Sequence, residues 1–137
     1  MKNNKLDKNG NLKNGVHTVL FKNGSIDNVG EFQNGEKTGI WKYYLANGIL
    51  KATGRCQNDK LVGEWTWYRE NGELMQTGGF DAEQKKTGLW KRYHPNGQTS
   101  DEGQYLADKK VGEWKIYDLT GKLIKSVQLG IKSSRKL

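Results

Sequence analysis

One sequence pattern recurs along most of the chain and decides what this chain can fold into. Its clearest copy is Gly63-Glu-Trp-Thr-Trp-Tyr68-Arg-Glu-Asn71-Gly72-Glu-Leu74-Met-Gln-Thr-Gly78-Gly-Phe80. The tryptophan position of the pattern holds His17, Trp41, Trp65, Trp90 and Trp114, which are 24, 24, 25 and 24 residues apart. A fixed period of this length is typical of a repeat array, in which each unit packs mainly against its neighbours.

The period divides the chain into one array with two short flanks. Five repeats are predicted, at residues 15–38, 39–62, 63–87, 88–111 and 112–130. Residues 1–14 are rich in Lys and Asn and are interpreted as a frayed N-terminal cap, and residues 131–137 as a basic C-terminal tail. With 137 residues the chain is long enough for one such array and too short for two sizeable cores.

Each repeat is predicted to be a β-hairpin. Counting from its first glycine as position zero, positions eight and nine hold Asn-Gly in the first four repeats and Thr120-Gly121 in the last. Asn-Gly between two short apolar runs predicts a two-residue type I′ turn, which needs a positive φ at both central residues. A second turn, such as Gln33-Asn-Gly-Glu36, links each hairpin to the next. The predicted fold is all-β, a single-layer antiparallel meander of about ten strands.

The turn geometry also predicts which side chains share a face of the sheet. A two-residue turn sets Trp41 opposite Gly54, Trp65 opposite Gly78 and Trp90 opposite Gly103, and Trp114 occupies the same position in the last repeat. An indole lying over the facing glycine would cover backbone that is otherwise wet. Leu50 and Leu74 are predicted on this buried face. The opposite face is predicted to carry a column of tyrosines about 10 Å apart. That column is Tyr44, Tyr68, Tyr93 and Tyr117. A single bulge would exchange residues between the two faces.

Composition favours acidic partners. Lys and Arg number 23 against 15 Asp and Glu, which gives a net charge of +8 and an isoelectric point of about 9.5. Acidic proteins, anionic lipids and nucleic acids are all attracted to such a chain, and charge alone does not choose among them. The first residues lack the apolar stretch of a signal peptide, so a cytoplasmic protein is expected.

The repeated motif G-x-W-x-x-Y-x-x-N-G-x-L-x-x-x-G, as in residues 39–54, resembles the MORN-repeat variant found in bacterial proteins of the YwqK antitoxin family. The resemblance covers about residues 15–130. It implies a non-enzymatic antitoxin or immunity protein that binds a cognate toxin. The looser resemblance to eukaryotic MORN arrays implies the alternative, a scaffold or peripheral membrane module that binds anionic lipid.

The inventory of reactive side chains is poor. His17 and His94 lie about three repeats apart, and Glu64 and Glu113 recur at one repeat position instead of converging as a pair. Cys56 takes a position held by Phe32 or Phe80 in other repeats, which indicates a buried side chain. We therefore predict no catalytic residues, no metal site and no cofactor, and we expect no enzymatic activity.

The partner is expected to be a cognate toxin or another acidic protein, with anionic lipid as the alternative and nucleic acid disfavoured, because the tryptophans are interpreted as core rather than as a base-stacking surface. The oligomeric state is not predicted. A tyrosine near a strand end either covers the sheet edge or anchors a partner, and both readings stay open. The predicted partner-binding residues are Tyr44, Tyr68, Tyr93 and Tyr117 with Lys42, Lys91, Arg92 and Lys115 at their sides; the predicted structural residues are Trp41, Trp65, Trp90, Trp114, Gly54, Gly78 and Gly103.

Overall fold

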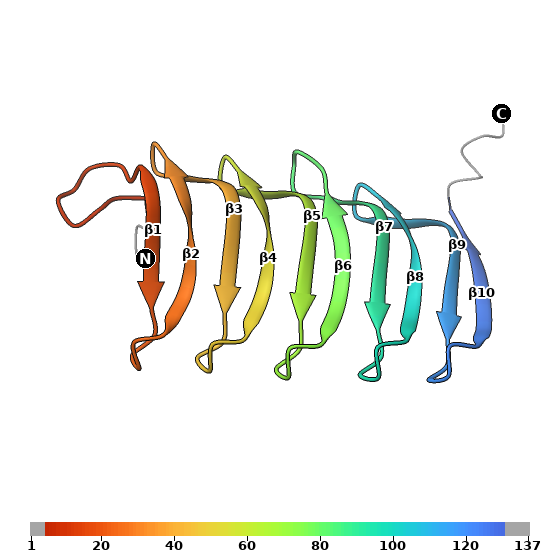
Figure 1. The fold of residues 1–137 in the computed structure, drawn as a ribbon. Helices are drawn as coiled ribbons and strands as arrows, with labels where there is room; N and C mark the ends of the chain where they lie inside the picture. The colour runs from red at the N-terminus through yellow and green to blue at the C-terminus, as the bar shows by residue number, and fades with distance from the viewer. Residues whose placement is uncertain (1–4, 131–137) are drawn as a thin grey trace, which may run out of the picture.

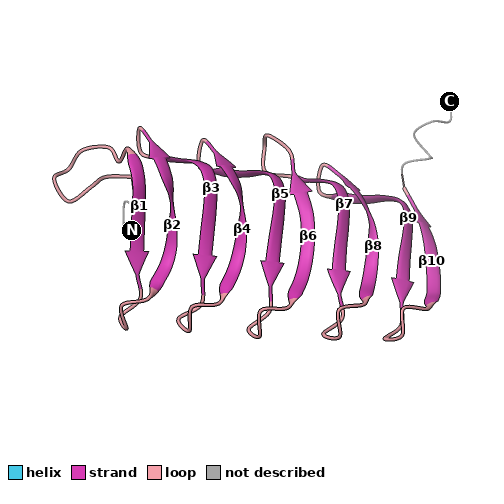
Figure 2. Cartoon of the chain, viewed as in Figure 1, coloured by secondary structure: helices cyan, strands magenta, loops and turns pink. Residues whose placement is uncertain are grey.

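The computed structural model describes residues 5–130 and contains one open antiparallel sheet (Figures 1 and 2). Its ten strands follow one another in chain order, so every strand pairs with its sequence neighbours, and the predicted all-β meander is confirmed. The strands are β1 (Gly15–Leu20), β2 (Ile26–Gln33), β3 (Glu36–Tyr44), β4 (Leu50–Gln57), β5 (Lys60–Tyr68), β6 (Leu74–Phe80), β7 (Lys86–Tyr93), β8 (Thr99–Leu106), β9 (Lys109–Tyr117) and β10 (Leu123–Leu129).

The Asn-Gly turns differ from the predicted type I′ geometry. In the first hairpin the Gly24 N–H donates to the Phe21 carbonyl at 2.9 Å, and the Phe21 N–H donates to the Ser25 carbonyl at 2.8 Å. Gly24 has a φ of 91°, whereas Asn23 is outside the left-handed region and uses its Oδ1 to accept the Ser25 N–H. This is a three-residue loop, a type I turn followed by a left-handed glycine. Asparagine is favoured at this position because its side-chain oxygen accepts a backbone N–H of the turn. Only the glycine of the pair adopts a left-handed φ.

Type I′ turns occur instead between repeats. Asn34 and Gly35 have φ values of 51° and 84°, and the pairs Asn58-Asp59 and Ala107-Asp108 are also left-handed at both residues. The link from β6 to β7 is one residue longer: Gln84, with a φ of 65°, takes the place of the glycine in a three-residue loop. The one 25-residue spacing in the period thus comes from a change of turn type.

The longer hairpin loop shifts the register beside it and moves the leucines. Trp67 pairs with Gln76 but the next residue, Tyr68, pairs with Leu74, so one residue is skipped. Directly opposed residues of a sheet lie on the same face. Leu50 and Leu74 therefore lie on the face of the tyrosines, and their predicted place beside the tryptophans is wrong. The skipped bulge residues are Asp27, Lys51, Met75, Ser100 and Ile124.

Each tryptophan joins its repeat to the preceding one. Trp65 pairs with Gly78 as predicted, but it also pairs with Gly54 on its other side, and its indole lies over Gly54. A Cβ built on Gly54 would lie 2.2 Å from Cδ2 of Trp65, and one on Gly78 would lie 2.0 Å from Cδ2 of Trp90. The predicted packing of Trp65 over Gly78 is corrected by one repeat.

The bulge at the first glycine of each repeat makes this joint possible. Between β4 and β5 the pairing jumps from Gly54–Trp65 to Arg55–Val62, so Gly63 (φ 68°) and Glu64 have no partners on β4. The indole Nε1 of Trp65 donates to the Arg55 carbonyl at 2.9 Å, at the point where the ladder is interrupted. Trp41, Trp90 and Trp114 donate to the equivalent carbonyls, those of Glu31, Gly79 and Gln104.

The N-terminal flank adds one turn to the array. Leu6 and Leu12 form an isolated bridge, and the Gly35 N–H donates to the Lys13 carbonyl at 2.9 Å. Residues 1–4 of the predicted cap and the basic tail predicted at 131–137 lie outside the described residues.

Candidate functional site

The two faces of the sheet carry different charge. We call the face of Trp41, Trp65, Trp90 and Trp114 the tryptophan face, and the face of Tyr44, Tyr68, Tyr93 and Tyr117 the tyrosine face. Leaving out the five bulge residues, strand residues on the tyrosine face include six cations (Lys42, Arg55, Lys60, Lys91, Lys109, Lys115) and five carboxylates (Glu31, Glu36, Glu64, Glu102, Glu113). The tryptophan face has five cations (Lys37, Lys86, Arg92, Lys110, Lys125) and one carboxylate, Asp101.

Aromatic rings form a continuous row along the tryptophan face. The ring contacts run from His17 and Phe32, whose centroids are 5.4 Å apart, to Tyr105 and Trp114 at 5.3 Å. The four indoles are buried, with exposed fractions of 1–6%, and they form the floor of this face. Tyr43, Trp67 and Phe80 are half-buried, so more of each of these rings is accessible on this face.

Four lysines extend over aromatic rings of the tryptophan face. We call Lys13, Lys37, Lys86 and Lys110 the lysine row. Lys37 Nζ lies 4.8 Å from the ring centroid of Trp41, Lys86 Nζ lies 4.9 Å from that of Trp90, and Lys110 Nζ lies 4.6 Å from that of Trp114. Lys13 stands in the same way over Phe32. Within residues 5–130 none of the four has a carboxylate within ion-pair distance.

The turns between repeats hold two of these lysines in place. The backbone N–H of Lys37 donates to Oδ1 of Asp59 at 2.8 Å, and the Lys37 carbonyl accepts the Asp59 N–H at 3.1 Å. Asp108 makes the same two contacts with Lys86. Since both backbone groups are fixed by the neighbouring turn, the lysine stems start from defined points on the sheet.

The lysine row was missed by sequence reasoning, although a signal existed. Lysine stands two residues before the first glycine in four of the five repeats, and Leu61 takes that position in the third. The position lies at a repeat boundary, outside the W-x-x-Y-x-x-N-G core on which the prediction was based.

A hollow of about 140 Å³ opens on the tryptophan face over β6 to β9. Its lining residues are Gln76, Lys86, Trp90, Arg92, Asp101, Tyr105, Lys110 and Trp114. Arg92 Nε donates to Asp101 Oδ1 at 3.0 Å, and a second contact joins Nη2 to Oδ2. Arg92 is therefore on the tryptophan face and paired within the chain, and its predicted place beside the tyrosines is wrong.

The tyrosine column forms, and part of it is bonded within the chain. The four tyrosines are half-buried and lie on one face two strands apart, as predicted. Tyr117 Oη donates to Oε2 of Glu102 at 2.6 Å, and this hydrogen bond raises the pKa of Tyr117 to about 12. Lys91 Nζ lies 3.8 Å from Oε1 of the same Glu102. Of the three lysines predicted beside the tyrosines, Lys91 is thus paired with a carboxylate of the chain.

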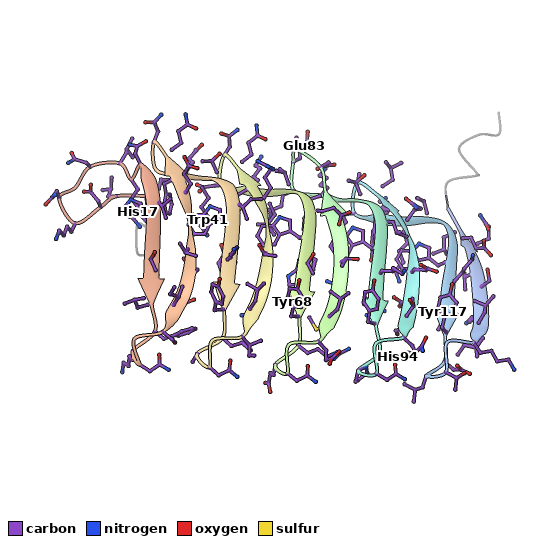
Figure 3. All side chains as sticks on the ribbon, in the orientation of Figure 1. His17, Trp41, Tyr68, Glu83, His94 and Tyr117 are labelled. Atoms are coloured by element: carbon purple, nitrogen blue, oxygen red, sulfur yellow. The ribbon has the colours of Figure 1, made fainter. Side chains whose placement is uncertain are left out.

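No catalytic grouping forms around the two histidines. Figure 3 shows His17 on β1 at one end of the array and His94 at the turn after β7, far along the sheet. His94 Nε2 lies 3.0 Å from the Tyr117 carbonyl, and His17 Nε2 lies 3.2 Å from that of Asn14. Within the described part of the chain, no group of three or more His, Cys, Asp or Glu side chains is arranged to hold a metal ion.

Cys56 is a buried side chain of the core. It is 1% exposed and belongs to the cluster of Phe32, Trp41, Ala52 and Trp65. Burial raises the pKa of its thiol to about 11, partly opposed by the charge of Lys37. The predicted burial is confirmed.

Comparison with known proteins assigns the family. The sequence model of the MORN repeat variant matches residues 37–55, 61–82, 86–107 and 110–128, which together make up more than half of the chain. The chain belongs to the MORN repeat variant family. No curated protein gave a match.

The family and the fold define the class of protein. An open sheet of repeated hairpins offers extended surface, and proteins built from this repeat are typically modules that bind a protein or a membrane. No helix within residues 5–130 is long and apolar enough to cross a membrane.

Proposed function

We propose that this protein is a non-enzymatic binding module that captures an acidic protein through its tryptophan face. We further propose that this partner is a bacterial toxin, neutralised in the cytoplasm because the array covers part of its surface. The observation that carries the proposal is the lysine row, four cations held over aromatic rings without carboxylate partners in the described structure. Complementary charge steers a partner to such a surface and favours one sign over the other.

The rigidity of the sheet supports binding by occlusion. Each repeat is fixed to the next by an indole over a glycine and by hydrogen bonds between turns. A surface that is already ordered loses little conformational entropy when it binds. The toxin as partner rests on the resemblance of the repeat to bacterial antitoxin proteins, and the family match supports the coarser class, a protein- or membrane-binding module.

The test is capture followed by a growth assay. Tagged protein is purified from its native host, and any captured protein is identified, expressed alone and then expressed together with this chain. The proposal requires that the captured protein arrests growth by itself and that co-expression restores growth. Recovery of the chain alone, or a captured protein that has no effect on growth, contradicts the toxin part.

Two matched variants decide which face makes contact. Lys86→Gln with Lys110→Gln removes two cations from the tryptophan face, and Lys91→Gln with Lys115→Gln removes two from the tyrosine face of the same two strands, β7 and β9. We expect only the first pair to weaken protection. Loss with the second pair alone would support the tyrosine face, where Tyr44, Tyr68, Tyr93 and Tyr117 with Lys42 were predicted to bind.

Sedimentation with vesicles of anionic phospholipid tests the other class of partner. Binding to vesicles that falls steeply with added salt, with no protein captured, would replace the proposal by the peripheral membrane scaffold.

A further inference from the structure

The spacing of the lysine row suggests the conformation of the segment that it binds. Successive repeats are two strands apart, which sets equivalent side chains about 10 Å apart along the array. A polyproline II helix has three residues per turn and rises about 3.1 Å per residue, so one turn advances about 9 Å. One turn of such a segment therefore spans about one repeat.

We infer that the tryptophan face binds an acidic polyproline II segment of the partner, which runs along the array and across the strands with one turn per repeat. Every third side chain of the segment then meets the lysine row. This inference rests on the proposed function, since it describes the part of an acidic protein partner that the array recognises.

Other regular segments keep this register less well. A β-strand returns a side chain to the same face every second residue, about 7 Å apart, which does not match the array. An α-helix returns one after seven residues, about 10.5 Å, but its contact line drifts by about 20° with every such step. Over four steps from Lys13 to Lys110 that drift turns the contacting side chains well away from the sheet. A polyproline II segment has no such drift, and aromatic-lined surfaces are known to bind it.

The chemistry of each contact is a carboxylate on a lysine ammonium. An ammonium has three N–H donors. The ring beneath it interacts with the positive charge and does not accept all three N–H groups, so a donor remains for a carboxylate. Lys86 Nζ lies over Trp90 and 5.0 Å from the Tyr105 centroid, and Lys110 Nζ lies over Trp114. The hollow of about 140 Å³ between these two lysines has room for a carboxylate side chain. Arg92 does not contribute a free charge there because Asp101 already holds it.

The middle of the row selects a different side chain. Leu61 takes the lysine position of the row and packs against the core cluster, as Trp67 and Phe80 also do. A carboxylate placed there would lose water without gaining a cation, so an apolar side chain is favoured. The expected pattern is Glu-x-x-Glu-x-x-Leu-x-x-Glu-x-x-Glu, and it reads the same in either chain direction.

The probe for this site is a synthetic proline-rich peptide with that pattern, labelled for fluorescence anisotropy. Two peptides of the same charge serve as comparisons: one with glutamate at every second position, and one designed as a helix with glutamate at every seventh. We expect the polyproline peptide to bind at least about tenfold more tightly than either, since each comparison peptide loses at least one charge-assisted hydrogen bond to the lysine row. Equal binding of all three peptides would show that only charge is recognised and would overturn the inference.

Protein variants test the placement. Lys86→Gln with Lys110→Gln should weaken binding of the polyproline peptide about tenfold or more, while Lys91→Gln with Lys115→Gln, on the other face of the same two strands, should change it less than about twofold. Leu61→Lys should shift preference toward a peptide with glutamate at its central position. If the second pair weakens binding as much as the first, or if Leu61→Lys leaves the preference unchanged, the site is elsewhere.

Failure of this inference is distinguishable from failure of the proposed function. A captured toxin whose binding is weakened by Lys86→Gln with Lys110→Gln, together with a polyproline peptide that binds no better than the two comparison peptides, would end the inference and leave the proposed function standing. If the peptide binds with the expected spacing but no toxin is captured, the inference stands and the toxin part of the proposed function fails.

Discussion

A single glycine and the tryptophan of the next repeat form the smallest structural unit of this protein. The absence of a Cβ at Gly30, Gly54, Gly78 and Gly103 lets an indole lie directly on the backbone, and the indole N–H reaches a carbonyl left open by the bulge. Neither residue provides this packing alone. The tryptophan needs bare backbone to cover, and the glycine needs a ring to keep water from its peptide groups.

Gly78→Ala should destabilise the fold by about 1–3 kcal/mol, because the new Cβ would lie 2.0 Å from Trp90 and would have to displace a packed indole. Urea unfolding followed by tryptophan fluorescence measures the change. Gly79→Ala is the control on the same strand: its Cβ meets the Thr87 carbonyl at 3.3 Å and no indole, so its cost should be smaller. Equal costs for the two variants would show that glycine is required here for backbone reasons rather than for the indole.

The thiol of Cys56 links stability to pH. Burial raises its pKa from an ordinary 9.0 to about 11, so the folded state binds this proton more tightly than the unfolded chain. The contribution is fully present below pH 9, and it is lost as the pH rises from about 9 to 11. Wild-type protein should therefore lose more stability over this range than Cys56→Ala, because the variant has no thiol to ionise. The difference between their thermal midpoints at several pH values tests this, and parallel curves would contradict it.

At the scale of the turn, residue type and backbone conformation agree in most repeats and disagree at Ala107. The type I′ turns use Asn34-Gly35 and Asn58-Asp59, whose residues tolerate a left-handed backbone. Ala107 has a φ of 48° and no side-chain group to offset the strain. Asp108 keeps its place because its carboxylate accepts the Lys86 N–H.

Ala107→Asn should stabilise the protein by about 0.5–1 kcal/mol, because asparagine adopts the left-handed region at lower cost. A rise in the thermal midpoint is the expected result. Ala46→Asn is the matched control, since Ala46 lies in a hairpin loop whose left-handed residue is Gly48. A similar rise in both variants would attribute the gain to solubility or to the unfolded state, and not to relief of backbone strain at residue 107.

Strand order was predicted correctly from the sequence because it depends on the period alone. The pairing of tryptophan with glycine was also predicted correctly, although from a two-residue turn, because the residue skipped at the bulge offsets the extra residue of the loop and restores the register. The turn types were not predicted correctly, because Asn-Gly is compatible both with a type I′ turn and with a type I turn followed by a left-handed glycine. That one ambiguity moved Leu50 and Leu74 to the other face. Arg92 was misplaced for a different reason. It adjoins Tyr93 in sequence, and neighbouring residues on a strand point to opposite faces.

At the scale of the whole molecule, the array is one-dimensional and has different ends. Within residues 5–130 each strand pairs only with its sequence neighbours, and each of the four joints uses one indole over one glycine. At the last repeat Val127 stands where the others have glycine, and at the first His17 stands where they have tryptophan. The joint that links the five hairpins is therefore not available on β10, which has no bare glycine at this position, or on β1, which has no indole.

A one-dimensional array predicts that equal damage has unequal effects at different joints. Gly30→Ala and Gly54→Ala introduce the same clash, with a Cβ 2.1 or 2.2 Å from Cδ2 of Trp41 or Trp65. Damage at the first joint isolates one hairpin and leaves four coupled, whereas damage at the second separates two repeats from three. Because stability is approximately a sum of repeat and interface terms, Gly54→Ala should give the broader urea transition, with a smaller dependence of the free energy of unfolding on urea concentration. Far-UV circular dichroism measures both curves. Identical slopes and midpoints would mean that the ten strands unfold as one cooperative unit, in which the position of a joint does not matter.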